Sequence, residues 1–352
     1  MKIALISDIH WDLRSGNQFF LDKYNEFFEK QFFPYLKENN IKTLFIGGDT
    51  WENRKKISIN SLQFAKENFF DKLKNDNIKV YSILGNHDVF FKNTNEVHSM
   101  HIIEESYDNL HLIYENEVIN FNGIDIAFVS WINNENYEKQ INFIKNTNAR
   151  YILGHFEISN FEMTRGHFCE EGLNQNLFQH FEQVWSGHFH IRSKQGNITY
   201  LGNPFQTNRG DIGYERGFHV FDTETKELEF IKNEYNIYER IYFENDLDVI
   251  NFNYEYYKNK IIIVYVKNLL DANTDSLNLL VENLNKICYK VEIEEIDRDE
   301  VSGAKIEIND IKSHLEIINE YIDNIIDDKE KQKQIKNILN LRYNECLQEM
   351  TN

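Results

Sequence analysis

Five short blocks of histidine, aspartate and asparagine lie within the first 190 residues of the chain, and each follows an apolar run. They are D-I-H (8–10), G-D (48–49), G-N-H-D (85–88), G-H (154–155) and G-H-F-H (187–190). Carboxylates, imidazoles and an amide without thiolates suit Mn²⁺, Fe²⁺ or Zn²⁺ better than Ca²⁺ or a structural zinc ion. One bridging carboxylate can hold two cations ~3.5–4 Å apart, which then activate a hydroxide and neutralise phosphoryl charge. The blocks therefore indicate a two-metal centre for phosphate esters.

The spacing within the blocks suits a shared cluster. In D-I-H and G-H-F-H the polar residues are two apart, so extended backbone points both the same way. Neighbouring glycines let the backbone approach closely. Each block alone is a weak signal, whereas five in order after strand-like runs are not expected by chance. The candidate metal ligands are Asp8, His10, Asp49, Asn86, His155, His188 and His190.

Strands and helices alternate around the first three blocks. Strands are expected at 2–7, 42–48 and 79–85, with helices at 18–39, interrupted by Pro34, and at 58–75. These form two βαβ units and hence a parallel sheet. Loops at the carboxyl ends of such strands converge at one edge, where ligands bind.

The middle of the chain is richer in strands. Helices are expected at 96–107 and 134–148. Strands are expected at 110–113, 117–121, 124–130, 150–154, 183–186, 198–201, 217–222 and 227–231. The fold class is therefore α/β, with two packed sheets flanked by helices.

The pattern changes near residue 245. A strand at 260–266, a helix at 273–287 and a strand at 290–296 predict a small β-α-β module. A charged linker (297–303) precedes apolar residues at helical spacing over 305–349, which predicts a helical hairpin. We expect a catalytic domain at 1–244, a capping module at 245–300, and the linker and hairpin at 301–352. The hairpin could dock on another chain or pack on its own domain.

Composition limits the classes of protein. Hydrophobic residues make up 41% of the chain, which is enough for a sizeable core. No run approaches the ~20 apolar residues that span a bilayer, no signal peptide is recognisable, and the cysteines are dispersed, so a cytoplasmic location is expected. The net charge of −19 argues against tight binding of nucleic acid by this chain alone, although metal cations can supply local positive charge.

The five blocks resemble the motifs of the calcineurin-like metallophosphoesterase superfamily, whose fold is a two-sheet sandwich flanked by helices. The resemblance implies two ligand sets that share one bridging carboxylate. The first set is Asp8, His10, Asp49 and His190. The second set is Asp49, Asn86, His155 and His188. His87 would instead steer or protonate the leaving oxygen as a general acid.

Within that superfamily the chain resembles the SbcD-type DNA repair nucleases, and among them the nuclease subunits of T-even-like phage recombination endonucleases. Beyond the blocks, this rests on VWSGHFH (184–190), YLGNPF (200–205) and RGFHVFDTETKELEFI (216–231). The resemblance implies an Mn²⁺-dependent deoxyribonuclease, with 3′-to-5′ exonuclease activity on duplex ends and endonuclease activity on single strands. The resemblance further implies a role in DNA repair, recombination and replication, and a phage-encoded copy would act in the host cytoplasm.

The resemblance also implies partners. It predicts a homodimer formed through the helices after the second and third blocks, and an SMC-like coiled-coil ATPase bound through 305–349. One position departs from the pattern, because cellular relatives often carry a histidine three residues after the bridging aspartate, where this chain has Glu52.

Two rival functions stay open. A phosphomonoesterase would clamp its dianionic substrate with arginines of the second and third blocks, where this chain has Asn53 and Leu84. Another phosphodiesterase of the superfamily is compatible with that difference. A non-catalytic scaffold for DNA or a partner is the second rival, and the intact set of ligands argues against it.

Overall fold

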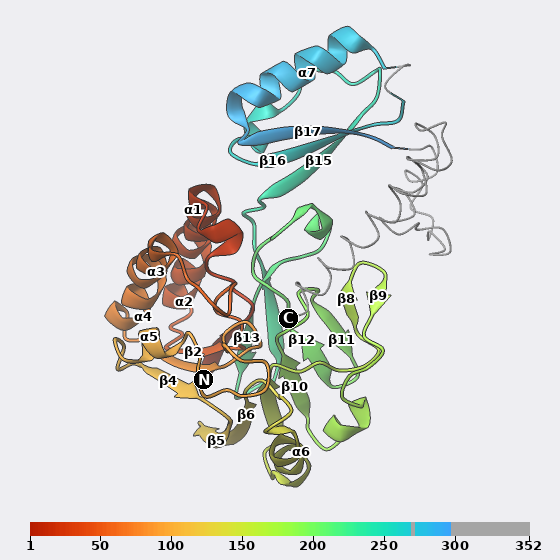
Figure 1. Cartoon of the computed structure of the whole chain (residues 1–352). Helices are drawn as coiled ribbons and strands as arrows, with labels where there is room; N and C mark the ends of the chain where they lie inside the picture. The colour runs from red at the N-terminus through yellow and green to blue at the C-terminus, as the bar shows by residue number, and fades with distance from the viewer. Residues whose placement is uncertain (269–271, 297–352) are drawn as a thin grey trace, which may run out of the picture. The chain divides into compact units, whose positions relative to one another are not determined.

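The computed structural model describes residues 1–268 and 272–296 (Figure 1). Four strands from the first 113 residues and two strands from 217–232 build one six-stranded sheet. Its strand order is β14-β13-β1-β2-β3-β4. The parallel strands are β1 (Lys2–Ile6), β2 (Thr43–Ile46), β3 (Lys79–Ile83) and β4 (Leu110–Ile113). The antiparallel strands are β13 (Gly217–Asp222) and β14 (Leu228–Lys232). The predicted βαβ units are therefore confirmed.

Two long helical segments cover this sheet. They comprise α1 (Gln18–Phe27) with α2 (Phe33–Glu38), and α3 (Ile59–Ala65) with α4 (Asp71–Asn75). A π-helical turn joins each pair, at Phe28–Phe32 and at Lys66–Phe70. The expected interruption at Pro34 is wrong, because the π turn widens the helix just before the proline and the chain stays helical. The phenylalanines of the first segment are core residues: Phe20, Phe27, Phe28, Phe32 and Phe33.

A second six-stranded sheet has the order β11-β12-β10-β7-β6-β5. Its strands are β5 (Asn116–Phe121), β6 (Ile124–Val129), β7 (Tyr151–Gly154), β10 (Gln183–Ser186), β11 (Ser193–Gln195) and β12 (Ile198–Tyr200). The two sheets share one buried cluster, in which Leu5 and Phe45 of the first meet Phe128, Leu153 and Trp185 of the second. Helix α6 (Tyr137–Asn146) packs in a separate cluster with the second sheet. The predicted two-sheet sandwich is confirmed.

Local differences from the expected elements lie between the strands. The expected helix at 96–107 is only α5 (His101–Glu104), because Phe90 N–H bonds the carbonyl oxygen of Val97 at 2.8 Å and holds that part extended. A short hairpin, β8 (Glu162–Thr164) and β9 (His167–Phe168), was not expected, nor was β11. Short 3₁₀ helices occur at Leu13–Ser15, Gln175–Phe178, Arg209–Asp211 and Tyr254–Tyr257.

The small module contains three parallel strands and one helix. Strands β15 (Tyr238–Phe243), β16 (Ile261–Val266) and β17 (Lys290–Glu295) form its sheet, and α7 (Thr274–Ile287) buries its leucines against one face. The sheet thus begins at Tyr238, upstream of the boundary expected at 245. Tyr289 stacks on Phe19 of α1 with ring centroids 3.7 Å apart.

The linker (297–303) and the hairpin (305–349) expected from the sequence lie outside the described residues. Among the residues that are described, no helix combines the length and apolar character needed to cross a membrane.

Candidate metal centre

The candidate ligands follow five strands of the two sheets. Asp8 and His10 follow β1, Asp49 follows β2 and Asn86 follows β3. In the second sheet, His155 follows β7, while His188 and His190 follow β10. Because all five strands present their carboxyl ends at the same edge of the sandwich, the loops converge there.

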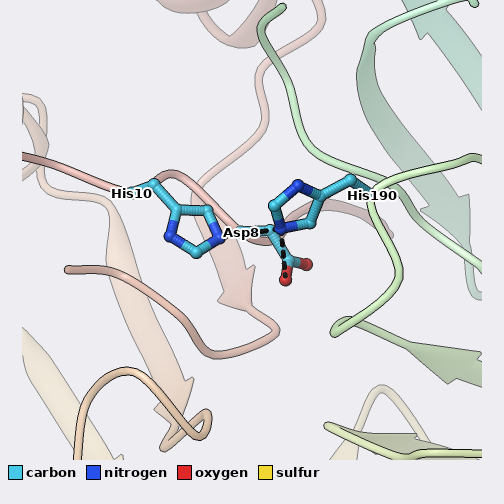
Figure 2. A group of neighbouring side chains, drawn as sticks. All are labelled: Asp8, His10 and His190. Atoms are coloured by element: carbon cyan, nitrogen blue, oxygen red, sulfur yellow. Dashed lines mark hydrogen bonds and ion pairs between the residues drawn. The ribbon is translucent and has the colours of Figure 1, made fainter. Parts of the chain in front are cut away.

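The first cluster contains Asp8, His10 and His190, which point toward one another (Figure 2). The Nε2 atoms of His10 and His190 are 2.9 Å apart, and His190 Nε2 is 4.0 Å from Asp8 Oδ1. Asp49 lies at the edge of the cluster, with Oδ2 3.9 Å from His10 Nε2. These are the four residues expected to hold the first cation.

The second cluster contains Asp49, His155 and His188, with Asn86 between the imidazoles. Asp49 Oδ2 lies 3.3 Å from His155 Nε2. The side-chain oxygen of Asn86 lies 3.1 Å from His155 Nε2 and 2.8 Å from His188 Nδ1. All seven candidate ligands are thus brought together in two adjoining groups.

The spacing of the donor atoms fits divalent cations. A cation with ligands at about 2.1 Å places neighbouring donors about 3 Å apart and opposite donors about 4.2 Å apart. The separations above run from 2.8 Å to 4.0 Å. Asp49 Oδ1 accepts the His87 backbone N–H at 2.7 Å, while Oδ2 is within reach of both groups. Asp49 Oδ2 is therefore the carboxylate oxygen that could contribute to both groups.

Four of the ligands have left-handed backbone. The φ angles are 54° at Asp8, 53° at His10, 49° at Asp49 and 85° at His188. Such φ values are uncommon outside glycine and cluster at functional sites. Backbone bonds between the loops support them: Asp8 N–H donates to the Gly48 carbonyl oxygen at 3.0 Å, and His10 N–H to that of Asp49 at 3.1 Å.

Gly85 is required by the close approach of two loops. A Cβ at this position would lie 2.1 Å from Asp49 Oδ1 and 2.3 Å from the Asp49 backbone nitrogen. A side chain here would displace the bridging carboxylate. The glycine that precedes Asn86 is therefore part of the geometry of the centre.

Burial and close charges shift the ionisation of the second cluster. Burial acts to raise the pKa of Asp49, but His155, together with other histidines, lowers it well below its usual value. Burial acts to lower the pKa of His155, but Asp49 and Asp8 raise it to about 9. Burial lowers the pKa of His188 to about 3, and the charge of His155 acts in the same direction.

In the first cluster too, the pKa of one histidine is raised and that of the other is lowered. Burial acts to lower the pKa of His10, but the facing carboxylates, led by Glu52, raise it to about 9. Burial holds the pKa of His190 well below its usual value, and His10 lowers it further. Burial raises the pKa of Asp8. Without a cation, each cluster therefore holds one protonated and one neutral imidazole.

The outward nitrogens of two ligands have different partners. His155 Nδ1 donates to the Gly47 carbonyl oxygen at 2.8 Å. His10 Nδ1 lies 2.9 Å from a carboxylate oxygen of Glu52. Such partners fix the ring orientation and the tautomer of a metal-bound histidine. Glu52, the residue that departs from the family pattern, is therefore placed to orient the candidate ligand His10.

His87 lies beside the first cluster. Its Nδ1 donates to the Glu52 carbonyl oxygen at 2.6 Å, and its ring centroid is 5.0 Å from that of His10. His87, His10 and Glu52 form a third group with donors within 4.8 Å of one another. Since a backbone carbonyl already engages Nδ1, Nε2 is the nitrogen of His87 left for a substrate.

Two residues near the ligands were missed in the sequence. Asp88 accepts the backbone N–H groups of Trp51 at 3.1 Å and Gly85 at 2.9 Å, and burial raises its pKa to about 7. The turn-forming Asn-His-Asp run was the signal available for it. Trp131 lies with its ring centroid 5.3 Å from that of His188, and no local signal in the sequence relates the two.

The basic residues near the site differ in their partners. Arg192 is paired with Glu215 at 3.0 Å, and Arg209 forms an ion pair with Glu294 of the small module. Arg165 donates to the Ile212 carbonyl oxygen at 3.1 Å. Arg54 is half-buried, and its Nη1 has no hydrogen-bond partner among the described residues.

Comparison with known proteins identifies the family of the chain. The sequence model of the family described as calcineurin-like phosphoesterase matches residues 1–250. The chain is 29% identical over 330 residues to exonuclease subunit 1 of Enterobacteria phage T4, which covers 93% of this chain and 94% of that protein. An archaeal phosphodiesterase of known structure is 14% identical with a TM-score of 0.33, covering 66% of this chain and 99% of that one. The chain therefore belongs to the calcineurin-like phosphoesterase family, and its expected likeness to a phage nuclease subunit is confirmed.

Proposed function

We propose that this protein is a two-metal deoxyribonuclease that hydrolyses phosphodiester bonds of DNA. The observation that carries the proposal is the placement of Asp49 Oδ2 between two groups of donors, 3.9 Å from His10 and 3.3 Å from His155. Two bound divalent cations would supply a nucleophile at neutral pH and neutralise charge on the phosphoryl oxygens. The mixed nitrogen and oxygen donors suit Mn²⁺, Fe²⁺ or Zn²⁺, and we propose Mn²⁺ from the likeness to the phage subunit.

His87 is proposed as the general acid. Its Nδ1 is engaged by the Glu52 carbonyl oxygen at 2.6 Å, and its backbone N–H by Asp49 at 2.7 Å. The ring is thereby fixed beside the ligands without replacing one. In the imidazolium form, Nε2–H can donate its proton to the oxygen that leaves when the phosphodiester breaks.

Cationic groups outside the ligand set support an anionic substrate in spite of the net charge of −19. Arg54, with its unpaired Nη1, follows the Asp49 loop. A Cβ on Gly213 would lie 3.3 Å from Arg240 Nη2 and 3.7 Å from Arg165 Nη2, so these guanidinium groups lie close together. Neither forms an ion pair with a carboxylate in the part of the chain that the structure describes. Phosphate oxygens are suitable partners for such groups.

The finer activities follow from the likeness to a phage exonuclease subunit. They are 3′-to-5′ digestion of duplex ends and endonuclease cleavage of single strands, in DNA repair, recombination and replication. The homodimer would form through the segments after the second and third blocks, and exposed Phe91, Val97 and Ile102 support an apolar interface there. The ATPase would bind through 305–349 and supply much of the cationic grip on DNA.

Phosphomonoester hydrolysis is disfavoured. Leu84 is fully buried, and Asn53 uses its side-chain oxygen to accept the Lys55 backbone N–H at 3.0 Å. Neither position offers the bidentate cation that a dianionic phosphate monoester requires. A non-catalytic scaffold is disfavoured by the complete set of ligands.

The test is a cleavage assay on end-labelled linear duplex, single-stranded DNA and a p-nitrophenyl phosphate monoester. We expect Mn²⁺-dependent release of nucleotides from DNA and little hydrolysis of the monoester. Hydrolysis of the monoester with intact DNA would contradict the proposal in favour of a phosphomonoesterase. No hydrolysis of any substrate by a protein with both cations bound would favour the scaffold.

A further inference from the structure

A cavity of about 410 Å³ adjoins the second cluster. His155 forms part of its wall, and Trp131, Ile132, Tyr137, Phe156 and Leu173 supply most of its apolar surface. The Trp131 ring centroid lies 5.3 Å from that of His188 and 6.0 Å from that of His155. A group bound in this cavity would therefore lie next to a phosphate held at the metal centre.

Trp131 is held rigidly by its backbone. Its N–H donates to the Leu84 carbonyl oxygen at 2.8 Å. Its carbonyl oxygen accepts side-chain N–H groups of Asn95 and Asn136, both at 3.0 Å. With its backbone held in this way and its ring packed beside His188 and His155, Trp131 loses little entropy when a flat ligand stacks on it.

The lining selects the chemistry of the ligand. Two flat rings, Trp131 and Tyr137, offer stacking surfaces. The charged residues of the wall are Lys92, Glu157 and Glu171, so acidic groups outnumber the basic one and disfavour a phosphate. The volume is in the usual range for sites of small organic ligands. An uncharged, flat heterocycle with N–H groups suits both the rings and the carboxylates.

We infer that this cavity binds one unpaired nucleobase of the substrate, next to the phosphodiester that is cleaved. The inference rests on the proposed nuclease function and names the form of DNA that the site accepts. A base stacked and paired inside a duplex cannot enter, because it must first leave its neighbours. The cavity therefore favours single strands and frayed ends over internal duplex.

The first test uses intrinsic fluorescence. Trp11, Trp51 and Trp185 are fully buried, whereas Trp131 is half-buried, and these are the four tryptophans of the chain. A short oligothymidylate, added with Ca²⁺ in place of Mn²⁺, should quench the emission of Trp131. The quenching should disappear in Trp131→Phe and with an abasic oligonucleotide of equal length. Equal quenching by both oligonucleotides, or none by either, would overturn the inference.

The second test compares cleavage at each phosphodiester of a single-stranded oligonucleotide with and without one abasic residue. With wild-type protein and Mn²⁺, we expect about tenfold slower cleavage next to the abasic residue and no change elsewhere, from the loss of one stacked base. Trp131→Ala should remove this difference, Trp131→Phe should retain part of it, and Tyr137→Ala should reduce it. Bound metal, measured by elemental analysis, should be equal in all four proteins.

The possible failures are distinguishable. If wild-type protein cleaves both oligonucleotides at the same rate at every position, the base pocket is wrong and the nuclease proposal stands. If it cleaves neither while both cations are bound, the proposed function fails and the pocket inference fails with it. If Trp131→Ala loses metal, the inference is judged from Trp131→Phe and Tyr137→Ala instead. It stands if both variants reduce the difference in cleavage next to the abasic residue, and it fails if neither does.

Discussion

The two clusters of the metal centre differ in how they orient their buried imidazole. In the second cluster, His155 donates to a backbone carbonyl oxygen, that of Gly47, at 2.8 Å. In the first, His10 faces the Glu52 side chain at 2.9 Å, and that side chain is 36% exposed. One orientation thus comes from the path of the main chain, and the other from one replaceable carboxylate. The first cluster should be the easier of the two to alter by mutation.

The largest expected effect removes the residue that the clusters share. Asp49→Ala should lower cleavage below about one thousandth of wild type and reduce bound metal, because Oδ2 faces both groups. Elemental analysis and the cleavage assay measure the two effects. Asp125→Ala, an exposed aspartate of β6, is the matched control. Wild-type cleavage by Asp49→Ala in a chelating buffer would refute the two-metal centre.

His87→Ala separates chemistry from metal binding. Because the proposed role of His87 is to protonate the leaving oxygen rather than to bind a cation, turnover should fall about 10²- to 10⁴-fold with both cations retained. Turnover under saturating substrate and metal content are the measurements. His111→Ala, an exposed histidine paired with Glu117, serves as the control. A collapse of metal occupancy would make His87 a ligand, as the third group of donors allows.

Glu52→Ala sharpens the comparison between the clusters. It removes the carboxylate beside His10 but keeps the backbone carbonyl that engages His87. One cation should bind about 10- to 100-fold more weakly, and the other should be unchanged. Metal titration by calorimetry resolves the two steps, with Glu52→Gln as the conservative variant. An equal loss of affinity at both steps would mean that Glu52 affects both cation sites and not that of His10 alone.

The number of protons released on metal binding should equal the number of clusters that bind a cation. In the metal-free protein the pKa of His10 and of His155 is about 9, so each cluster carries one imidazolium at pH 7.5. Since imidazole binds a metal in its neutral form, about two protons should be released on loading, and affinity should rise with pH up to about 9. Calorimetry in buffers of different ionisation enthalpy measures the number. Release of no proton would contradict the assigned charges.

The same pKa shifts affect the metal-free fold. A histidine whose folded pKa is raised from 6.5 to about 9 stabilises the fold fully below pH 6.5. That contribution is lost as pH rises through 9, so the metal-free protein should melt at lower temperature at pH 9 than at pH 6.5. Bound cations should abolish this difference.

The smallest effect on cleavage is expected from deleting residues 303–352, which carry the predicted hairpin. All seven candidate ligands lie between residues 8 and 190, so we expect Mn²⁺-dependent cleavage of short single strands to persist. Co-purification with the ATPase and ATP-stimulated processing of long duplex should fail. Full co-purification of the shortened chain would exclude the hairpin as the docking segment. Aggregation or loss of basal cleavage would place the hairpin in the core of the protein.

The convergence of the seven candidate ligands could be predicted because each lies shortly after an apolar strand, and strand ends of one sheet meet in space. The contact between Glu52 and His10, and that between Trp131 and His188, could not, because they depend on how separate loops fold together. Strand β15 was not predicted because Glu239 and Arg240 interrupt its apolar pattern. The π turn before Pro34 likewise depends on packing around aromatic residues rather than on local propensity.

The left-handed backbone at Asp8, His10, Asp49 and His188 also limits how the protein can evolve. Each such residue costs the fold about 1 kcal/mol or more, which glycine would recover. Selection of random variants for thermal stability alone should therefore enrich glycine at these positions and yield proteins that are more stable but inactive. Selection for cleavage must keep the strain, so gains in stability compatible with activity have to arise elsewhere in the sandwich.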